Sequence, residues 1–241
     1  MDFNFVIQIA LINFAAAFLQ ASTGFGYAIF AMSLMPLILP MRYCSAISAI
    51  TVVVIGLQMV SILRKKVRIK IILLPVMCCM LTTNIGMYLL MHCPEHLLRI
   101  ILAVFIVLLD LYFILSGKFH IKIRKTVFNG CLCGALTGIS TGMFNIVGPF
   151  FMVYYFNICD DNLQYKANLE MSFLIAGLYS TFLHIMVGNI TMQVFPYITT
   201  SAVAVIAAGF LGLKLFQRLN RESICRIIYF ALPVMAFMLI R

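Results

Sequence analysis

Residues 100–109 run Ile-Ile-Leu-Ala-Val-Phe-Ile-Val-Leu-Leu, ten apolar side chains without a polar face. A second run of this kind covers Ser201–Leu213. A helix that is apolar on every side needs apolar surroundings on every side. The strands of a transmembrane barrel would instead alternate apolar and polar residues. These runs therefore predict α-helices that cross a lipid bilayer.

The composition extends this interpretation to the whole chain. Of the 241 residues, 64% are hydrophobic and 10% are charged, whereas soluble domains carry about 25% charged residues. So few charges cannot cover a surface that faces water, so lipid must be the solvent for most of the chain. The first residues contain Asp2 and no basic stretch. We therefore expect no cleavable signal peptide.

Ten apolar segments follow one another with short polar breaks between them. A helical span of a bilayer needs roughly 20 apolar residues, and no break is long enough to hold a soluble domain. We expect one integral domain of the plasma membrane, with an N-terminal repeat over residues 1–117 and a C-terminal repeat over 118–241. The segments cover residues 4–20, 26–39, 43–63, 71–91, 98–116, 126–142, 145–156, 168–187, 194–213 and 225–240.

The basic residues predict how the chain is oriented. If the loop at residues 64–70 is cytoplasmic, alternation of the segments places 14 of the 17 basic residues on that side, Lys166 among them. Only Arg42, Arg99 and Arg241 then lie on the other side. An excess of Lys and Arg marks cytoplasmic loops. The net charge of +10 is thus a topology signal, and nucleic acid is not an expected partner. Both termini are predicted to be extracytoplasmic.

The order of the segments predicts an internal symmetry. Five segments per half is an odd number, so the two halves enter the membrane from opposite faces, as in inverted repeats. One local match supports this. Ser22-Thr23-Gly24 separates segments one and two, and Ser140-Thr141-Gly142 separates segments six and seven. We therefore predict an all-α polytopic membrane protein built from two inverted repeats of five helical segments.

The same two breaks predict hairpins. Residues 4–39 and 126–156 are each short for two complete spans, because a helix rises only about 1.5 Å per residue. Both arms of each pair are therefore expected to be short for a full span. The first two segments of each half are expected to form a broken or re-entrant hairpin with its tip inside the membrane. A re-entrant hairpin and two complete spans both return the chain to the side from which it started. The distribution of basic residues therefore does not decide between these two alternatives.

The hairpin tips are the predicted substrate site. The first amides of each second arm lack intrahelical partners, and the helix dipole is positive there. Two inverted tips would aim these ends at the middle of the protein and bind an anion without a buried Lys or Arg. The alternative is that the small residues only allow close helix packing. The candidate substrate-binding residues are Gln20, Ser22, Thr23, Gly24, Gly26, Ser140, Thr141, Gly142, Asn145 and Gly148.

A few polar residues outside the tips permit two interpretations each. Asp110 and Glu170 are acids within apolar segments, so they either couple transport to protons or reach the interface. For His184, near the outer end of its segment, we favour an interfacial place over a proton relay. The cluster at residues 92–96, His-Cys-Pro-Glu-His, either binds a metal or is an ordinary loop. We favour the loop and expect no metal or cofactor.

Two stretches resemble a known family. Residues 20–28, Gln-Ala-Ser-Thr-Gly-Phe-Gly-Tyr-Ala, and the glycine-rich residues 134–149, followed by Tyr154, resemble the signatures of the sulfite exporter TauE/SafE family of membrane permeases. The chain departs from the pattern at Asn145 and Val147, where members often have glycine, and in having Ser33 and Pro36 in place of the usual early proline. The resemblance implies transport of sulfite, sulfonates or related small anions.

These observations predict a secondary transporter that moves a small anion by alternating access. The expected partners are the anion, the lipid bilayer and a coupling ion, either a proton or sodium, and a homodimer is left open. No nucleotide-binding motif of the G-x-x-x-x-G-K-[ST] type occurs. The absence of His-Glu-x-x-His and G-x-S-x-G motifs argues against an enzyme. The alternative function is a non-transporting membrane anchor subunit of a larger complex.

Overall fold

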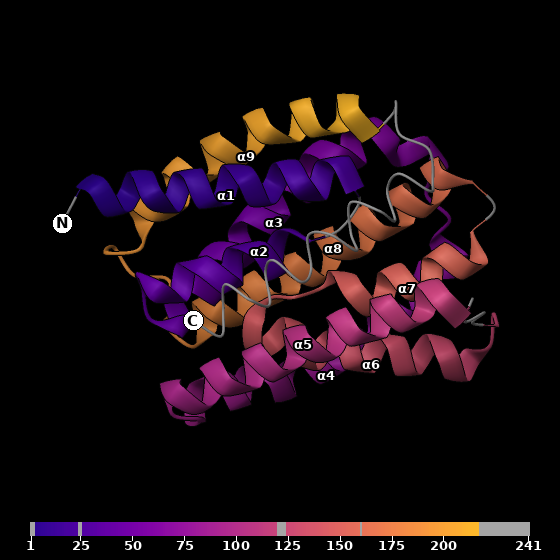
Figure 1. Ribbon diagram of the computed structural model, residues 1–241, viewed down its shortest axis with the longest axis horizontal. Helices are drawn as coiled ribbons and strands as arrows, with labels where there is room; N and C mark the ends of the chain where they lie inside the picture. Colours follow the sequence, from indigo (N-terminus) through magenta and orange to yellow (C-terminus); the bar gives the residue numbers. More distant parts are fainter. Residues whose placement is uncertain (1–2, 24–25, 120–123, 160, 217–241) are drawn as a thin grey trace.

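A computed structural model describes residues 3–23, 26–119, 124–159 and 161–216, and all regular structure in these ranges is helical (Figure 1). Short connections join helices that lie roughly along one direction. The apolar runs predicted such a bundle of helices. The helices are α1 (Phe3–Thr23), α2 (Tyr27–Leu34), η1 (Met35–Leu37), α3 (Met41–Leu63), η2 (Arg64–Lys66), α4 (Ile69–His92), α5 (Glu95–Phe119), α6 (Val127–Phe144), α7 (Gly148–Ile158), α8 (Asn162–Met186) and α9 (Phe195–Phe216).

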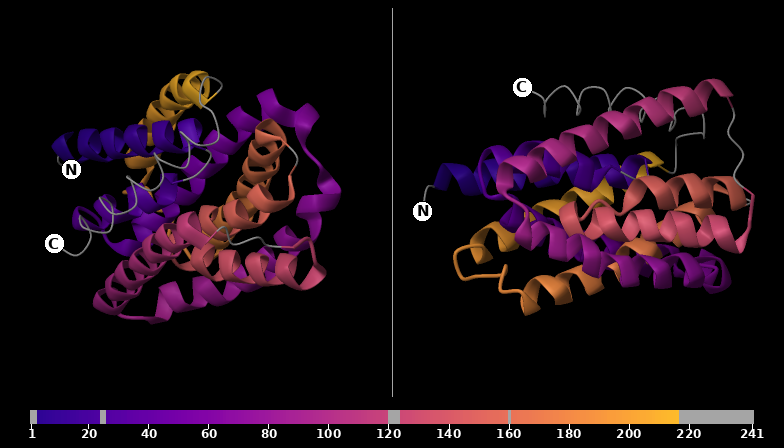
Figure 2. Two further views of the ribbon diagram at one scale, coloured as in Figure 1. Left: turned by 45° about the vertical axis from the view of Figure 1, so that its right-hand side comes forward. Right: turned by 90° about the horizontal axis from the view of Figure 1, so that it is seen from below.

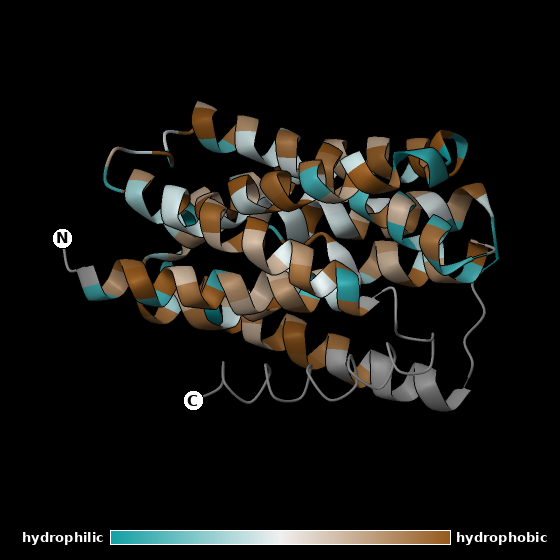
Figure 3. Cartoon of the chain, turned by 90° about the horizontal axis from the view of Figure 1, so that it is seen from above, coloured by the Kyte–Doolittle hydropathy of each residue, from teal (hydrophilic) through white to brown (hydrophobic). Residues whose placement is uncertain are grey.

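The outer surface of the bundle is apolar. Large side chains such as Leu81, Phe128 and Val203 are 70–73% exposed. Figure 3 shows hydrophobic residues along the helices and hydrophilic ones gathered near their ends. Six of the described helices are long and apolar enough to cross a membrane. Because such a surface is stable only against lipid, the prediction of an all-α polytopic membrane protein is confirmed.

The first nine predicted segments each correspond to an observed helix, and the tenth, at 225–240, lies outside the described residues. The main difference is the start of α8, at Asn162 and not at residue 168. Asp161 caps this helix, since its Oδ1 accepts a hydrogen bond from the Gln164 amide at 2.7 Å. The first turns of α8 are polar, so the apolar pattern missed them. Lys166 therefore lies inside a helix, and its placement in a polar break is wrong.

Three helix pairs dominate the packing: α1 lies along α9, α4 along α6, and α3 along α8 (Figures 1 and 2). The contact between α4 and α6 is close because α6 presents glycine there. A Cβ atom on Gly138 would lie 2.2 Å from the Cys79 carbonyl oxygen, and one on Gly142 would lie 2.2 Å from that of Thr83. This is the small-residue packing typical of membrane helices.

The two hairpins have one long and one short arm. The first arms, α1 with 21 residues and α6 with 18, are long enough to span by length. The expectation that both arms are short is thus wrong for the first arms. The second arms, α2 with 8 residues and α7 with 11, extend only about 12 and 17 Å at 1.5 Å per residue. How deep the tips lie in a bilayer stays a prediction.

Loops that were predicted on opposite sides of the membrane lie at opposite ends of the bundle. At one end η2 meets the start of α8, where Lys66 Nζ is 3.8 Å from Asp161 Oδ2. At the other end the residues after α8 meet the end of α4, where Asn189 Nδ2 is 3.5 Å from Met91 Sδ. Helices α1 and α6 start at opposite ends of the molecule in Figure 1. The assignment of one end to the cytoplasm stays a prediction.

Candidate functional site

Both short helices begin after a residue with left-handed backbone. Gly26 precedes α2 with φ 108°, and Asn145 follows α6 with φ 53°. Glycine and asparagine adopt this conformation at little steric cost. The Asn145 amide donates to the Thr141 carbonyl oxygen at 2.7 Å, and the Ile146 amide donates to that of Ser140 at 3.3 Å. These bonds end α6 and turn the chain sharply into α7.

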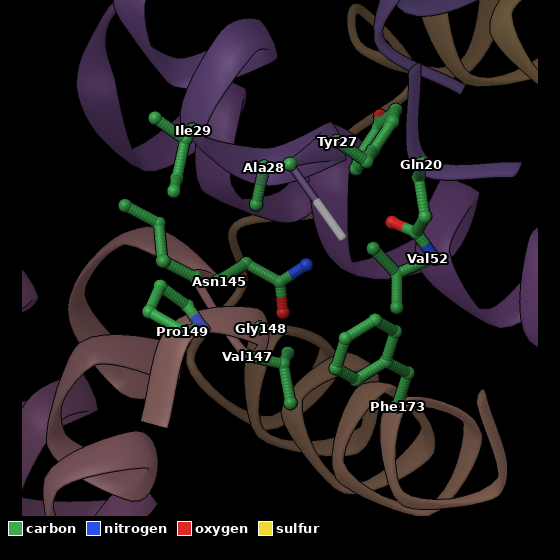
Figure 4. A pocket seen from close by; sticks show the side chains of 12 residues that line it. Gln20, Tyr27, Ala28, Ile29, Val52, Asn145, Val147, Gly148, Pro149 and Phe173 are labelled. Atoms are coloured by element: carbon green, nitrogen blue, oxygen red, sulfur yellow. The ribbon is translucent and has the colours of Figure 1, made fainter. Parts of the chain in front are cut away.

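The starts of α2 and α7 face the same buried pocket. Its lining comes from the first turn of α2 (Gly26–Ile29), the start of α7 (Ile146–Pro149), and the side chains of Gln20, Asn145, Val52 and Phe173 (Figure 4). The cavity volume is about 10 Å³, which is about the room that one water molecule needs. In this conformation the pocket is therefore closed around a very small space.

No charged side chain lies in the lining of the pocket, and the two helix starts place partial positive charge there. The first amides of a helix have no intrahelical acceptor, and the helix dipole places about half a positive charge at this end. The first residues of α2 supply such amides, and Gly148 supplies one in α7, whereas Pro149 has no N–H. Two helix starts that converge on one point form an environment suited to an anion.

The side chain of Asn145 marks the centre of this environment. Its Nδ2 donates to Ser48 Oγ at 3.2 Å, while its fully buried Oδ1 has no hydrogen-bond partner among the described residues. The oxygen and nitrogen of an amide can exchange places by a half turn. After that turn Oδ1 accepts from the Ser48 hydroxyl, and Nδ2 becomes the unpartnered atom. An unsatisfied buried polar atom costs about 1–3 kcal/mol, so a ligand at this point would relieve an existing cost.

Tyr27 fixes the other wall of the pocket. Its hydroxyl group hydrogen-bonds to Asn13 of α1 and to Thr51 of α3. The Asn13 side chain in turn donates to the Ile9 carbonyl oxygen at 2.7 Å. These buried contacts join α1, α2 and α3, so they hold the start of α2 in its orientation toward the pocket. None of these three polar residues was among the sequence candidates.

Four of the predicted substrate-binding residues line this pocket: Gln20, Gly26, Asn145 and Gly148. The hairpin interpretation identified them because it placed the functional groups where each second arm begins. Gly24 lies outside the described residues, and so does the side chain of Thr23.

The remaining predicted residues lie elsewhere. The hydroxyl groups of Ser22, Ser140 and Thr141 donate to the carbonyl oxygens of Phe18, Ile146 and Thr137, at 2.8, 2.8 and 2.7 Å. Gly142 packs against α4. None of these four residues is in the lining.

A buried ion pair borders the pocket, and neither of its residues was among the substrate-binding candidates. Lys166 Nζ and Glu170 Oε1 are 3.3 Å apart, and both side chains are fully buried. Lys166 Nζ also donates to the Gln20 carbonyl oxygen at 3.2 Å, and Gln20 Nε2 donates to Glu170 Oε2 at 3.2 Å. The Gln20 carbonyl belongs to the last turn of α1, where carbonyls lack intrahelical donors and the dipole is negative.

This pair corrects two expectations. Lys166 is buried in the bundle and does not belong to a loop, and a cation does lie beside the predicted site. Glu170 is buried too, so the interpretation that it reaches the interface is wrong. The available signal was the spacing of the two residues, because Lys and Glu four positions apart share one face of a helix.

The other polar residues of the sequence analysis have ordinary roles or are not described. His184, in the last turn of α8, is fully buried between Ser45 Oγ at 3.2 Å and Asn189 Nδ2 at 3.0 Å, and its place at the membrane interface stays a prediction. In the 92–96 loop, His92 Nδ1 is 2.8 Å from the Tyr88 carbonyl oxygen. Within the described ranges, no three His, Cys, Asp or Glu residues gather as metal ligands would. The Asp110 side chain is outside the described part.

A helical membrane bundle with a central pocket between the starts of broken helices is the architecture of secondary transporters. Comparison with known families agrees with this class. The family model described as sulfite exporter TauE/SafE matches residues 9–239, so the chain belongs to that family. It is therefore a multi-pass membrane transport protein, and the resemblance noted in the sequence is confirmed. Comparisons with characterised proteins and with solved structures gave no significant match.

Proposed function

We propose that this protein is a secondary transporter that binds sulfite, a sulfonate or a related small anion between the first turns of α2 and α7. The observation that carries the proposal is the convergence of two helix starts on one buried pocket, at which Asn145 has an unpartnered polar atom. An oxyanion has several acceptor oxygens, so it can receive hydrogen bonds from backbone amides of both helices and from the Asn145 amide.

The pocket must open for this function. A cavity of about 10 Å³ holds about one water molecule, and any sulfur oxyanion is larger. The structure thus corresponds to a conformation in which the site is closed. Alternating access would separate the pocket walls toward one side of the membrane at a time, around a site formed by both halves of the chain.

An inverted repeat is part of the proposal, and the helix packing supports it. Exchanging the first and second halves turns the α1–α9 pair into the α6–α4 pair and leaves the α3–α8 pair unchanged. Glycine takes part in both of the exchanged contacts. Gly86 of α4 packs on Ile139 and Gly142 of α6, while Gly212 of α9 packs on Ala21 of α1. Gly86 and Gly212 occupy the same position in their helices, counted from the first residue.

The test is transport by the purified protein in sealed liposomes. We expect uptake of sulfite or of a small sulfonate such as methanesulfonate, and competition between the two. Protein-free liposomes are the background control, and potassium and choline uptake tests whether the protein merely makes the vesicles leak. Absence of flux for sulfite, sulfonates, sulfate and chloride alike would contradict the proposed function.

A further inference from the structure

The ion pair beside the pocket differs from the other two ion pairs of the described structure. Lys66–Asp161 and Arg99–Glu95 are about half exposed, whereas Lys166 and Glu170 are fully buried. Burying two charges costs about as much as their attraction returns, so a pair of this kind is weak evidence for stability. Ionisable groups inside membrane bundles usually mark ion or proton pathways.

Gln20 connects this pair to the pocket. Its side chain lines the pocket and donates to Glu170 Oε2, while its backbone oxygen accepts from Lys166 Nζ. One residue therefore touches the carboxylate, the ammonium group and the space proposed for the anion. A change in the charge of Glu170 must alter the partners of Gln20 and the electrostatic potential at the pocket.

We propose that Glu170 is the proton-binding site that couples transport of the anion to a proton gradient. The proposal rests on the proposed function. With Glu170 ionised, the pair is neutral and the carboxylate holds the Gln20 amide. When a proton from water binds a Glu170 oxygen, the Glu170 carboxyl group becomes neutral while Lys166 keeps its positive charge. The anion then supplies the balancing charge, and the Gln20 amide is released to donate to it.

Among the residues that the structure describes, Lys166 is the charged partner of Glu170. Between Asn4 and Ser22, α1 has no ionisable side chain. The buried ionisable groups on the helices packed against α8 are thiols and phenols, which carry no charge near neutral pH. The charged residues of η2 are exposed, and Lys66 there faces Asp161. The buried thiols and phenols are Cys44 of α3, Cys79 of α4, Cys133 of α6, and Tyr154 and Tyr155 of α7.

The coupling is reciprocal. If a proton on Glu170 favours the anion, a bound anion must favour the proton to the same degree. One proton and one monovalent anion would thus cross together, and the loaded site would be no more highly charged than the empty one. The competing interpretation is that Lys166 and Glu170 only fasten the end of α1 to α8, without any exchange of protons.

The first test needs no variant. Methanesulfonate is a suitable probe because it stays ionised from acidic to alkaline pH, unlike sulfite. Adding it to the purified protein in weakly buffered detergent solution should remove protons from the medium, approaching one proton per bound anion. Its apparent Kd should rise by up to about tenfold per pH unit on the alkaline side. Binding without proton uptake would overturn the inference.

The second test uses Glu170→Gln in proteoliposomes. This variant mimics the protonated carboxyl group, so methanesulfonate exchange should persist and lose its pH dependence. Accumulation driven by an inward proton gradient should disappear. The matched control is Glu95→Gln, which neutralises an exposed acid four residues from Arg99 and should behave like the wild type. Accumulation by Glu170→Gln at the wild-type level would overturn the inference.

The double variant Lys166→Met/Glu170→Gln addresses a purely structural role. With both charges removed, no unpaired charge is left buried, so folding should be retained and can be checked by Tm. We expect its affinity for methanesulfonate to fall at least tenfold below that of Glu170→Gln. Equal affinity would show that Lys166 does not bind the anion and would overturn the inference.

If the wild type transports the anion without proton coupling, this inference fails and the proposed function stands, whereas absence of transport removes both.

Discussion

At the scale of single residues, Asn145 combines a backbone role with a chemical one. Its φ of 53° needs a residue that tolerates left-handed backbone, and its amide offers a polar atom to the pocket. Asn145→Gly separates the roles, since glycine keeps the turn and removes the amide. We expect the affinity for the transported anion to fall about ten- to a hundredfold, corresponding to about 1.5–3 kcal/mol for a hydrogen bond to a charged ligand.

A second variant, Asn145→Asp, tests whether the site binds an anion. Aspartate has nearly the same size and tolerates the same φ, but its negative charge would repel an anion. Transport should be abolished, and Tm should fall below that of the wild type because the carboxylate is buried without a charged partner. Binding measured by calorimetry, flux in liposomes and Tm together check this. Wild-type affinity in the glycine variant would remove Asn145 from the site.

The residues of the site could be predicted in part. Gln20, Gly26, Asn145 and Gly148 follow from local rules, because a broken helix exposes its first amides wherever its turn occurs. The partnership of Gln20 with Lys166 and Glu170 does not follow from such rules. Gln20 is 146 positions away from Lys166 and 150 positions away from Glu170 in the sequence. The contacts arise only when the end of α1 packs on the start of α8. A sequence pattern cannot show which polar residues meet across helices.

At the scale of helices, the regular spacing of glycine in α6 has a packing role. Gly134, Gly138 and Gly142 are four residues apart and lie on one face, against α4. A Cβ on Gly142 would lie 2.2 Å from the Thr83 carbonyl oxygen and 2.5 Å from the Met87 amide nitrogen. Backbone atoms cannot move aside as a side chain does, so the two helices would have to separate.

We therefore expect Gly142→Ala to lower the stability of the folded protein by about 1–3 kcal/mol, the usual cost of overpacking. Gly177→Ala is the matched control, because its Cβ would meet side-chain methyl groups of Val52 and Val53 at 3.2 Å, and the nearest backbone atom, the Ala49 oxygen, lies at an ordinary 3.6 Å. Tm in detergent should drop clearly for the first variant and little for the second. Equal Tm values with selective loss of anion binding in Gly142→Ala would instead place this glycine in the site.

The helices themselves were the most predictable level of the structure. Runs of apolar residues predicted the nine α-helices of the described part, because a helix inside a bilayer is apolar along its length. The errors occurred where polar residues are helical. The first turns of α8 contain Gln164, Lys166 and Asn168, all of them buried, and hydropathy counts such residues as a loop. A helix that begins with buried polar residues is stable only when residues from other helices form hydrogen bonds with them. A short window of sequence does not show those partners.

At the scale of the whole molecule, the two ends of the bundle should face different compartments. Lys66 and Arg124 are exposed in the connections after α3 and before α6. His96 is exposed in the first turn of α5, and Met192 is exposed in the connection after α8. Because basic residues are retained on the cytoplasmic side, reporters inserted at Lys66 or Arg124 should be protected from an impermeant reagent in intact cells. Reporters at His96 or Met192 should react.

This arrangement also tests the inverted repeat, because the connections after α3 and α8 occupy corresponding positions in the two halves. In an inverted repeat they must face opposite sides, and in a parallel repeat they would face the same side. Reporters at Lys66 and Met192 should therefore always differ in accessibility, whichever side is cytoplasmic. Permeabilised cells, in which every reporter should react, provide the control. Reaction at both positions in intact cells would contradict the inverted architecture and the paired opposition of α2 and α7 at the pocket.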